Sequence, residues 1–173
     1  MHQILFYSPK ESPYGCFSNF SRHKVQVYGQ TWETSEHPFQ AMKYHPHRPD
    51  LVQMVLKAVG PMRAAEIGRD RGNPIRPDWD SLVPNPSPLV VDDGRGPAPV
   101  IERVKDQIMY EVVWAKFTQH NDLQSILLST GASPIIENAI HDPYWGWGSS
   151  QTGVNRLGKI LMAVRSELQV GLR

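Results

Sequence analysis

Apolar residues recur along most of the chain at steps of three or four positions, the spacing that lines one face of an α-helix. This spacing predicts helices over 36–44, 51–59, 62–67, 101–117, 121–131 and 154–168. Strand-like patterns are short and few, and we expect antiparallel strands at 3–7 and 24–28. There are too few strands between the helices for a parallel, doubly wound sheet. The pattern therefore predicts an α+β fold, a predominantly α-helical single domain with a few short antiparallel strands.

Proline breaks this pattern in one region. The sequence holds 15 prolines in 173 residues, and seven of them lie between Pro74 and Pro99. No helical period appears there, and only residues 89–91 resemble a strand. We expect one domain over residues 1–173 with a Pro-rich insertion at about 81–99. Such a long irregular span is typical of a functional or disordered segment, with a passive surface loop as the alternative.

Charge and cysteine content exclude several classes of protein. With 18 Lys and Arg against 17 Asp and Glu, the formal charge is +1, so the chain lacks the basic field of a protein that coats nucleic acid. Its single cysteine cannot form an internal disulfide and gives no reason to expect an oxidising compartment. No window approaches the length of an apolar membrane span, and the N-terminus shows no secretory leader. We expect a cytoplasmic protein that does not enter a membrane.

The expected helix from residue 36 carries a polar face. Glu36, Gln40 and Lys43 follow each other at steps of four and three residues, so they share one side of the helix. A glutamate at a helix start can act as a general base or a fixed negative charge, and the lysine can hold an anion or orient the glutamate. The alternative is a solvent-exposed helix face on which these charges are incidental.

A second polar and aromatic segment, HDPYWGWGSSQTGVNRLGKIL, occupies residues 141–161. Asp142, Tyr144 and Trp145 combine a carboxylate with stacking surfaces, a mixture that suits a nucleobase or a ribose. A glycine-containing turn at 153–155 precedes the last helix, where small residues can expose backbone N–H groups to a phosphate. The alternative is a tight turn with aromatic side chains packed beneath it.

Arginines form a third cluster, in and just before the segment GRDRGNPIRPDW at 68–79. Arg69 and Arg71 lie among turn residues, Arg63 lies upstream, and Trp79 ends the segment. Guanidinium groups bind phosphates through two hydrogen bonds, so the cluster fits a diphosphate. Arginines on an ordinary surface loop are the alternative.

Two other kinds of chemistry find little support in the sequence. The histidines lack metal-ligand spacing, with no HExxH or Cys-His pattern, so we expect no metal site. Cys16 lies in SPYGCFSNF, away from any helix start that would activate a thiol. We expect it to be a packed side chain rather than a nucleophile.

Four blocks of the sequence resemble the NADAR or YbiA-like superfamily. They are FYSPKESPYGCFSNF (6–20), TWETSEHPFQAMKY (31–44), GRDRGNPIRPDW (68–79) and DPYWGWGSSQTGVNRLGKILMAVR (142–165). The blocks occur in family order over nearly the whole chain. The Pro-rich stretch is a departure, because compact bacterial members pass almost directly from the tryptophan to the long helix.

The resemblance implies an enzyme, without a cofactor or a metal, that hydrolyses a C–N glycosidic bond to ribose. Two substrates are associated with the superfamily: ADP-ribose on guanine, as a nucleotide or in DNA, and phosphoribosylated aminopyrimidines of riboflavin synthesis. We expect the first, because the arginine cluster and the glycine turn offer the two anion sites that a diphosphate needs. An ADP-ribosyltransferase toxin would then be a partner. The competing hypothesis is a module that binds ADP-ribose or NAD without turnover.

Such a reaction passes through a state that resembles an oxocarbenium ion, which requires a negative group, an activated water and donors for the leaving base. By resemblance, Glu36 orients the water or balances the cation, and Asp142 holds ribose hydroxyls or assists proton transfer. Lys43 neutralises phosphate or tunes Glu36. The expected substrate-binding residues are Asn19, Gln40, Arg63, Arg69, Arg71, Trp79, Tyr144, Trp145, Gly146, Gly153 and Asn155.

Overall fold

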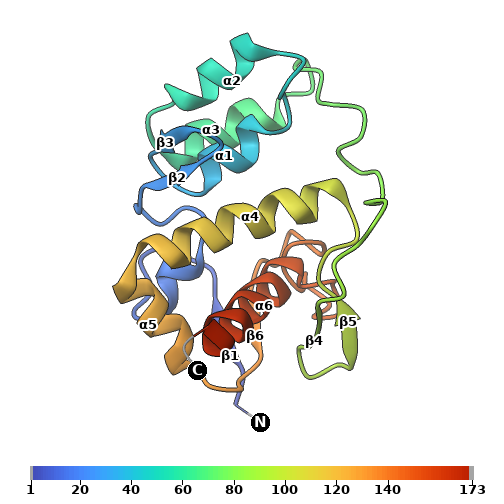
Figure 1. The fold of residues 1–173 in the computed structure, drawn as a ribbon. Helices are drawn as coiled ribbons and strands as arrows, with labels where there is room; N and C mark the ends of the chain where they lie inside the picture. The colour runs from blue at the N-terminus through green and yellow to red at the C-terminus, as the bar shows by residue number, and fades with distance from the viewer. Residues whose placement is uncertain (1, 172–173) are drawn as a thin grey trace.

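Helix α4 (Val104–Gln119) crosses the middle of the molecule and separates two groups of elements (Figure 1). The computed structural model describes residues 2–171. The first group consists of β2 (Val25–Val27), β3 (Gln30–Trp32), α1 (Glu36–Ala41), α2 (Pro49–Leu56) and α3 (Gly60–Arg69). The second consists of β1 (Ile4–Phe6) with the 3-10 helix η1 (Tyr14–Phe17), β4 (Val90–Asp92), β5 (Pro97–Pro99), α5 (Asn121–Ser129), β6 (Ile135–Glu137) and α6 (Arg156–Gly171).

Each group has an apolar core of its own. In the first, Trp32, Tyr44 and Val55 are buried between β3 and the three short helices. The second core is larger and joins α4 and α6 to β1 and β6, with Phe6 and Phe117 among its fully buried side chains. Residues between the two cores come from both groups, and the candidate site lies there.

All six expected helices are present, with shifted ends. Helix α1 ends at Ala41 rather than Tyr44, and residues 42–47 continue as turns. Ser35 occupies the N-cap position, but its hydroxyl donates to Asn19 Oδ1 at 3.0 Å instead of capping the helix. The mainly helical α+β fold is confirmed. Among the described residues, no helix combines the length and the apolar character needed to cross a membrane.

Of the two strands expected to be antiparallel, one is confirmed and one is not. Strands β2 and β3 form an antiparallel hairpin, and its turn uses the left-handed backbone of Tyr28 and Gly29, with φ of 56° and 71°. Strand β1 instead pairs in parallel with β6, so the antiparallel expectation for residues 3–7 is wrong. The partner strand was missed because three residues carry too little alternation to be recognised in a sequence.

The Pro-rich segment contains regular structure. Strands β4 and β5 pair as an antiparallel hairpin, which corrects the expectation of a loop interrupted by one strand-like piece. Prolines hid β5, because proline lacks the N–H group that a strand normally donates. In the hairpin turn, Asp92 Oδ1 accepts hydrogen bonds from the backbone N–H groups of Gly94 and Gly96 at 2.8 and 2.9 Å.

Helix α6 approaches β6 closely because residue 158 is glycine. A Cβ atom at Gly158 would lie 2.2 Å from the carbonyl oxygen of Ile135 and 2.5 Å from Oδ1 of Asn155. Neither neighbour can move freely, since one belongs to a paired strand and the other is fully buried. The helix and the strand can therefore pack in this way only around a residue without a side chain.

Gly158→Ala is expected to lower the free energy of unfolding by about 2 kcal/mol or more, because overpacking forces the backbone of β6 to shift. Gly171→Ala on the same helix is the matched control: an added Cβ there meets no atom within 4 Å. Its expected effect is within about 0.5 kcal/mol. Urea unfolding followed by circular dichroism measures both, and equal stability of the two variants would contradict the close packing.

Candidate active site

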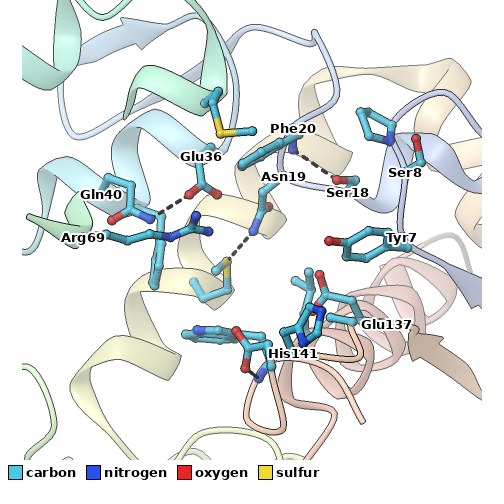
Figure 2. A pocket seen from close by; sticks show the side chains of 18 of the residues that line it. Tyr7, Ser8, Ser18, Asn19, Phe20, Glu36, Gln40, Arg69, Glu137 and His141 are labelled. Atoms are coloured by element: carbon cyan, nitrogen blue, oxygen red, sulfur yellow. Dashed lines mark hydrogen bonds between the residues drawn. The ribbon is translucent and has the colours of Figure 1, made fainter. Parts of the chain in front are cut away.

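A cavity of about 760 Å³ opens between the two groups of elements (Figure 2). Its walls come from the segments that follow β1 and η1, from α1 and α3, from α4 and α6, and from the loop after β6. The polar residues that line it are Tyr7, Ser8, Ser18, Asn19, Glu36, Gln40, Lys43, Arg69, Glu137, His141 and Asp142. The cavity thus joins the first and the last of the sequence blocks that carry the family resemblance.

Glu36 begins α1 and faces this cavity with a side chain that is 6% exposed. Gln40 Nε2 donates a hydrogen bond to its Oε1 at 2.7 Å. Burial raises the pKa of Glu36, while the hydrogen bond from Gln40 and the nearby charge of Lys43 lower it. The polar face of α1 is buried, so the alternative of a solvent-exposed charged face is wrong.

Lys43 and Arg69 bring positive charge to the same wall. Lys43 lies beyond the end of α1, and its Nζ donates to the carbonyl oxygen of Gly68 at 2.9 Å. Burial lowers the pKa of Lys43 to about 8, against the opposing effect of Glu36, so the amine is mostly protonated at neutral pH. Arg69 ends α3, and its guanidinium group points into the cavity beside Glu36 (Figure 2).

Asp142 and Trp145 reach the cavity from the loop that follows β6. Asp142 Oδ1 accepts hydrogen bonds from the backbone N–H groups of Tyr144 and Trp145, both at 2.9 Å. This arrangement is an Asx turn, in which the carboxylate shapes its own loop. The ring of Trp145 meets that of Phe39 edge to face, with centroids 5.2 Å apart, and offers the cavity an aromatic surface.

Four of the expected substrate-binding residues line the cavity, and the others do not. The cavity includes Asn19, Gln40, Arg69 and Trp145, but not Arg63, Arg71, Trp79, Tyr144, Gly146, Gly153 or Asn155. Arg63 makes an exposed ion pair with Glu66 at 2.9 Å. Trp79 is buried in the larger core, and the Tyr144 hydroxyl donates to Asp106 at 2.6 Å. Substrate contacts by these outlying residues stay a prediction.

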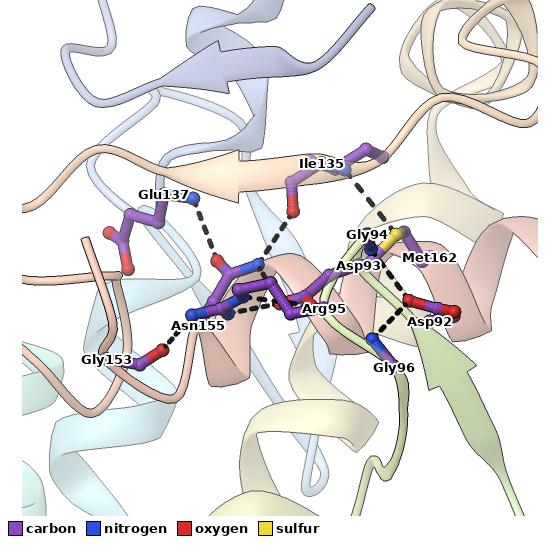
Figure 3. A network of polar contacts seen from close by, with 10 residues as sticks. All are labelled: Asp92, Asp93, Gly94, Arg95, Gly96, Ile135, Glu137, Gly153, Asn155 and Met162. Carbon is purple, nitrogen blue, oxygen red and sulfur yellow. Dashed lines mark hydrogen bonds and ion pairs between the residues drawn. The ribbon is translucent and has the colours of Figure 1, made fainter. Parts of the chain in front are cut away.

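The glycine turn at 153–155 serves the scaffold (Figure 3). The backbone N–H groups of its three residues donate to carbonyl oxygens of the protein at 2.8, 2.7 and 2.9 Å. The carbonyl of Gly153 accepts from Arg95 Nη1 at 2.6 Å, and the Asn155 side chain is fully buried. The expectation that this turn offers free N–H groups to a phosphate is therefore wrong.

Sequence reasoning missed Glu137, which lies at the end of β6 and lines the cavity. Burial and the neighbouring charges of Asp142 and Glu36 raise its pKa to about 8. Its Oε2 is buried and finds no hydrogen-bond partner among the described residues. The available signal in the sequence was an acidic residue directly after two isoleucines, five positions before the DPYWG motif.

The loop after η1 is held by a second residue that sequence reasoning missed, Lys116 of α4. This lysine is 1% exposed, and its Nζ donates to the carbonyl oxygen of Ser18 at 3.0 Å and to Ser21 Oγ at 2.6 Å. Burial lowers the pKa of Lys116 to about 7. The neighbouring Asn19 is anchored in turn by its Nδ2 group, which donates to the sulfur of Met109 at 3.3 Å.

Cys16 is a buried free thiol, as the sequence predicts, and burial raises its pKa. Across residues 2–171, no three His, Cys, Asp or Glu side chains are grouped so that they could hold a metal ion. The chemistry that the cavity offers is that of carboxyl groups, two cationic side chains and aromatic rings.

Several named proteins are similar in sequence to this chain over almost its full length. N-glycosidase YbiA of Escherichia coli (strain K12) is 37% identical over 167 residues, covering 96% of this chain and 89% of that protein. N-glycosidase Npun_R5314 of Nostoc punctiforme is 36% identical over 167 residues, covering 96% and 92%. The riboflavin biosynthesis protein PYRR, chloroplastic, of Zea mays is 36% identical over 168 residues, which are 90% of this chain but 23% of that protein.

The fold has a solved counterpart. The NMR structure of the E. coli protein YbiA is 36% identical in sequence and matches with a TM-score of 0.77, over 99% of this chain and 89% of that one. Residues 5–169 match the model of the NADAR domain. The match extends over both groups of elements and over every wall of the cavity. The chain belongs to the NADAR family.

Proposed function

We propose that this chain is an N-glycosidase that hydrolyses the bond between ribose C1′ and a base nitrogen, with ADP-ribosylated guanine, as a nucleotide or in DNA, as its substrate. The observation that carries this proposal is the buried Glu36 carboxyl group, which faces a cavity that also holds cationic and aromatic side chains. The names of the bacterial relatives, both N-glycosidases, support the reaction type.

Cleavage of a ribose C1′–N bond builds positive charge on the sugar, so a fixed negative group beside the ribose accelerates it. In the proposed reaction, Glu36 balances this charge and takes a proton from the attacking water. Gln40 holds the Glu36 carboxylate in one orientation through the 2.7 Å hydrogen bond to Oε1. Such positioning matters because water and sugar carbon must approach along a defined line.

The remaining cavity residues supply the binding groups of the proposed substrate complex. Lys43 and Arg69 receive phosphate oxygens, since both are cationic and lie on one wall. Asp142 uses Oδ1 to shape its loop, which leaves Oδ2 to accept a hydrogen bond from a ribose hydroxyl. Trp145, whose ring is supported edge to face by the buried Phe39, presents a ring surface on which a base can stack.

Cavity size supports ADP-ribosylated guanine as the substrate. Small-molecule sites occupy about 300–1,000 Å³, and the present cavity, at about 760 Å³, lies in the upper part of that range. It is roomy for a single nucleotide and suits a ligand with two nucleosides. An ADP-ribosyltransferase toxin that modifies guanine would supply this substrate and is the partner that we propose, in the cytoplasm, where Cys16 stays reduced.

A phosphoribosylated aminopyrimidine is the second candidate substrate. The cavity contains one pair of cationic side chains, and the glycine turn adds no second phosphate site. A single phosphate needs no more than this pair. The names of relatives from Zea mays and Vibrio vulnificus refer to riboflavin biosynthesis, although this chain spans 23% and 38% of those proteins.

The two substrates are separated by one assay. The protein is incubated in parallel with ADP-ribosylated guanine, free and in an oligonucleotide, and with the aminopyrimidine ribosyl phosphate, and released sugar is measured by chromatography. We expect release of ADP-ribose from the first. Release of ribosyl phosphate from the aminopyrimidine alone would contradict the proposed substrate in favour of the second candidate. Tight binding of ADP-ribose, with no sugar released from either substrate, would show that the chain is a binding module.

Glu36→Gln is expected to lower kcat by about 100-fold or more while KM changes less than about threefold, because a lost general base affects the chemical step. Glu66→Gln is the matched control, since Glu66 lies on α3, is exposed and is outside the cavity. Steady-state kinetics on the substrate that is turned over measures both. Equal activity of the two variants would rule out Glu36 as a catalytic group.

Arg69→Ala is expected to raise KM by about tenfold, because a charge-assisted hydrogen bond to phosphate is worth about 1.5–3 kcal/mol. Arg48→Ala is the control, since Arg48 pairs with Asp50 in an exposed ion pair at 2.6 Å and does not line the cavity. The rise in KM should shrink at high ionic strength, where the phosphate contact is screened. An unchanged KM in Arg69→Ala would remove Arg69 from the binding site.

A further inference from the structure

We propose that Glu137 is the second catalytic carboxyl group, the acid that protonates the leaving nitrogen while Glu36 activates the attacking water. This assignment rests on the N-glycosidase function proposed above. Glu137 ends β6, and its side chain turns into the cavity on the far side from Glu36 (Figure 2). In a displacement at C1′ the leaving base and the attacking water lie on opposite faces of the sugar, and a carboxyl group on each side of the cavity suits the two proton transfers.

The first argument for this role is the unpaired oxygen of Glu137. Its Oε2 is buried and has no hydrogen-bond partner within residues 2–171. A buried polar atom without a partner costs free energy unless something pairs with it in the working state of the protein. Glu137 also lines the cavity, so a substrate that reaches this wall can meet its carboxyl group.

The second argument is that the two carboxyl groups have different hydrogen-bond partners and different neighbouring charges. Glu36 accepts a hydrogen bond from Gln40 and lies near the positive charge of Lys43, and both contacts favour its ionised form. Glu137 has no donor on Oε2. When two carboxyl groups share one cavity, the proton goes to the group whose ionised form is less stabilised. Burial raises the pKa of both carboxyl groups, and by these contacts the group with the less stabilised ionised form is Glu137, which we assign as the proton donor.

The charges that face Glu137 act in the same direction. Asp142 on the following loop and Glu36 across the cavity add to the effect of burial and raise its pKa to about 8. The other titratable groups that line the cavity are Tyr7, Lys43, Arg69 and His141. The two cations lie with Glu36 at the α1 and α3 wall, so their charge stabilises that carboxylate first.

The third argument is that the backbone of Glu137 is held on both sides. Its N–H group donates to Asn155 Oδ1 at 3.0 Å, and its carbonyl oxygen accepts from the N–H group of Trp147 at 3.1 Å. Glu137 also pairs with Phe6 in the parallel ladder of β1 and β6. A catalytic group needs such support, because a displacement of about 1 Å weakens catalysis strongly.

The proposed step balances in atoms and protons. The C1′–N bond breaks with its electron pair on nitrogen, and the Glu137 carboxyl proton passes to that nitrogen. Water attacks C1′, and its proton passes to the Glu36 carboxylate, which leaves a hydroxyl group on the sugar. After product release, Glu36 loses a proton to solvent and Glu137 gains one, so the enzyme returns to its starting state.

The test compares Glu137→Gln with the wild-type protein and with the control Glu66→Gln. We expect Glu137→Gln to lower kcat by about 100-fold or more at neutral pH, with KM within about threefold. The wild-type kcat, measured at saturating substrate, should fall as pH rises through the pKa of Glu137, because only the protonated acid can donate. Deprotonation of Lys43, whose pKa is also about 8, weakens phosphate binding and raises KM instead. This alkaline limb should be absent in Glu137→Gln and unchanged in Glu66→Gln. Substitution of a residue with a purely structural role would lower the rate without removing this alkaline limb of the pH profile.

A second measurement does not depend on the variant's folding. Carboxyl carbon NMR of the wild-type protein, labelled on glutamate and assigned by sequential methods, follows the titration of Glu137 directly. We expect its midpoint well above the ordinary range of a glutamate. A midpoint below pH 5, or a Glu137→Gln enzyme that keeps the wild-type rate and its alkaline limb, would overturn the assignment. If the wild-type protein hydrolyses neither substrate, the proposed function fails, and this assignment fails with it.

Discussion

The amide side chain of Asn155 holds together the parts of the structure that form the cavity. Its Oδ1 accepts from the N–H group of Glu137, and its Nδ2 donates to the carbonyl of Ile135 and to Asp93, at 3.0, 3.0 and 3.2 Å. Asn155 has a φ of 54°, a conformation that asparagine tolerates better than most residues. It is fully buried, so each lost bond would leave an unpaired polar group inside the protein. One residue thus fixes β6, the start of α6 and the position of Glu137.

The sequence revealed most of what depends on helical period. The stripes of α4 and α6 repeat often enough to be recognised, and the polar face of α1 was visible from Glu36, Gln40 and Lys43. Burial of that face was not visible, because it depends on packing between distant segments. Strand β6 and its Glu137 were missed for a related reason: three residues show no period, and their partner lies at the other end of the chain.

A sequence motif also does not show whether its residues support the fold or contact a substrate. The glycine turn and the DPYWG segment stand out in the sequence, and both are structural in part. A Cβ at Gly146 would lie 2.6 Å from the carbonyl oxygen of Glu137, and one at Gly153 would lie 2.5 Å from that of Pro143. Residues that permit such close approaches are as restricted in identity as residues that touch a substrate. Only the positions of their backbone and side-chain atoms separate the two kinds.

The Pro-rich segment belongs to this scaffold. Its hairpin places Asp93, which is 1% exposed, against Asn155, and Arg95 bridges Asp93 to the carbonyl of Gly153 (Figure 3). The hairpin therefore reaches Glu137 through a single side chain, that of Asn155. Of this ion pair Asp93 is buried and Arg95 is partly exposed, and loss of a partner would leave the buried Asp93 carboxylate uncompensated, which is costly. Loss of the hairpin contact would thus loosen the strand that carries Glu137 before it disturbed Glu36, whose supports lie across the cavity in α1 and the loop after η1.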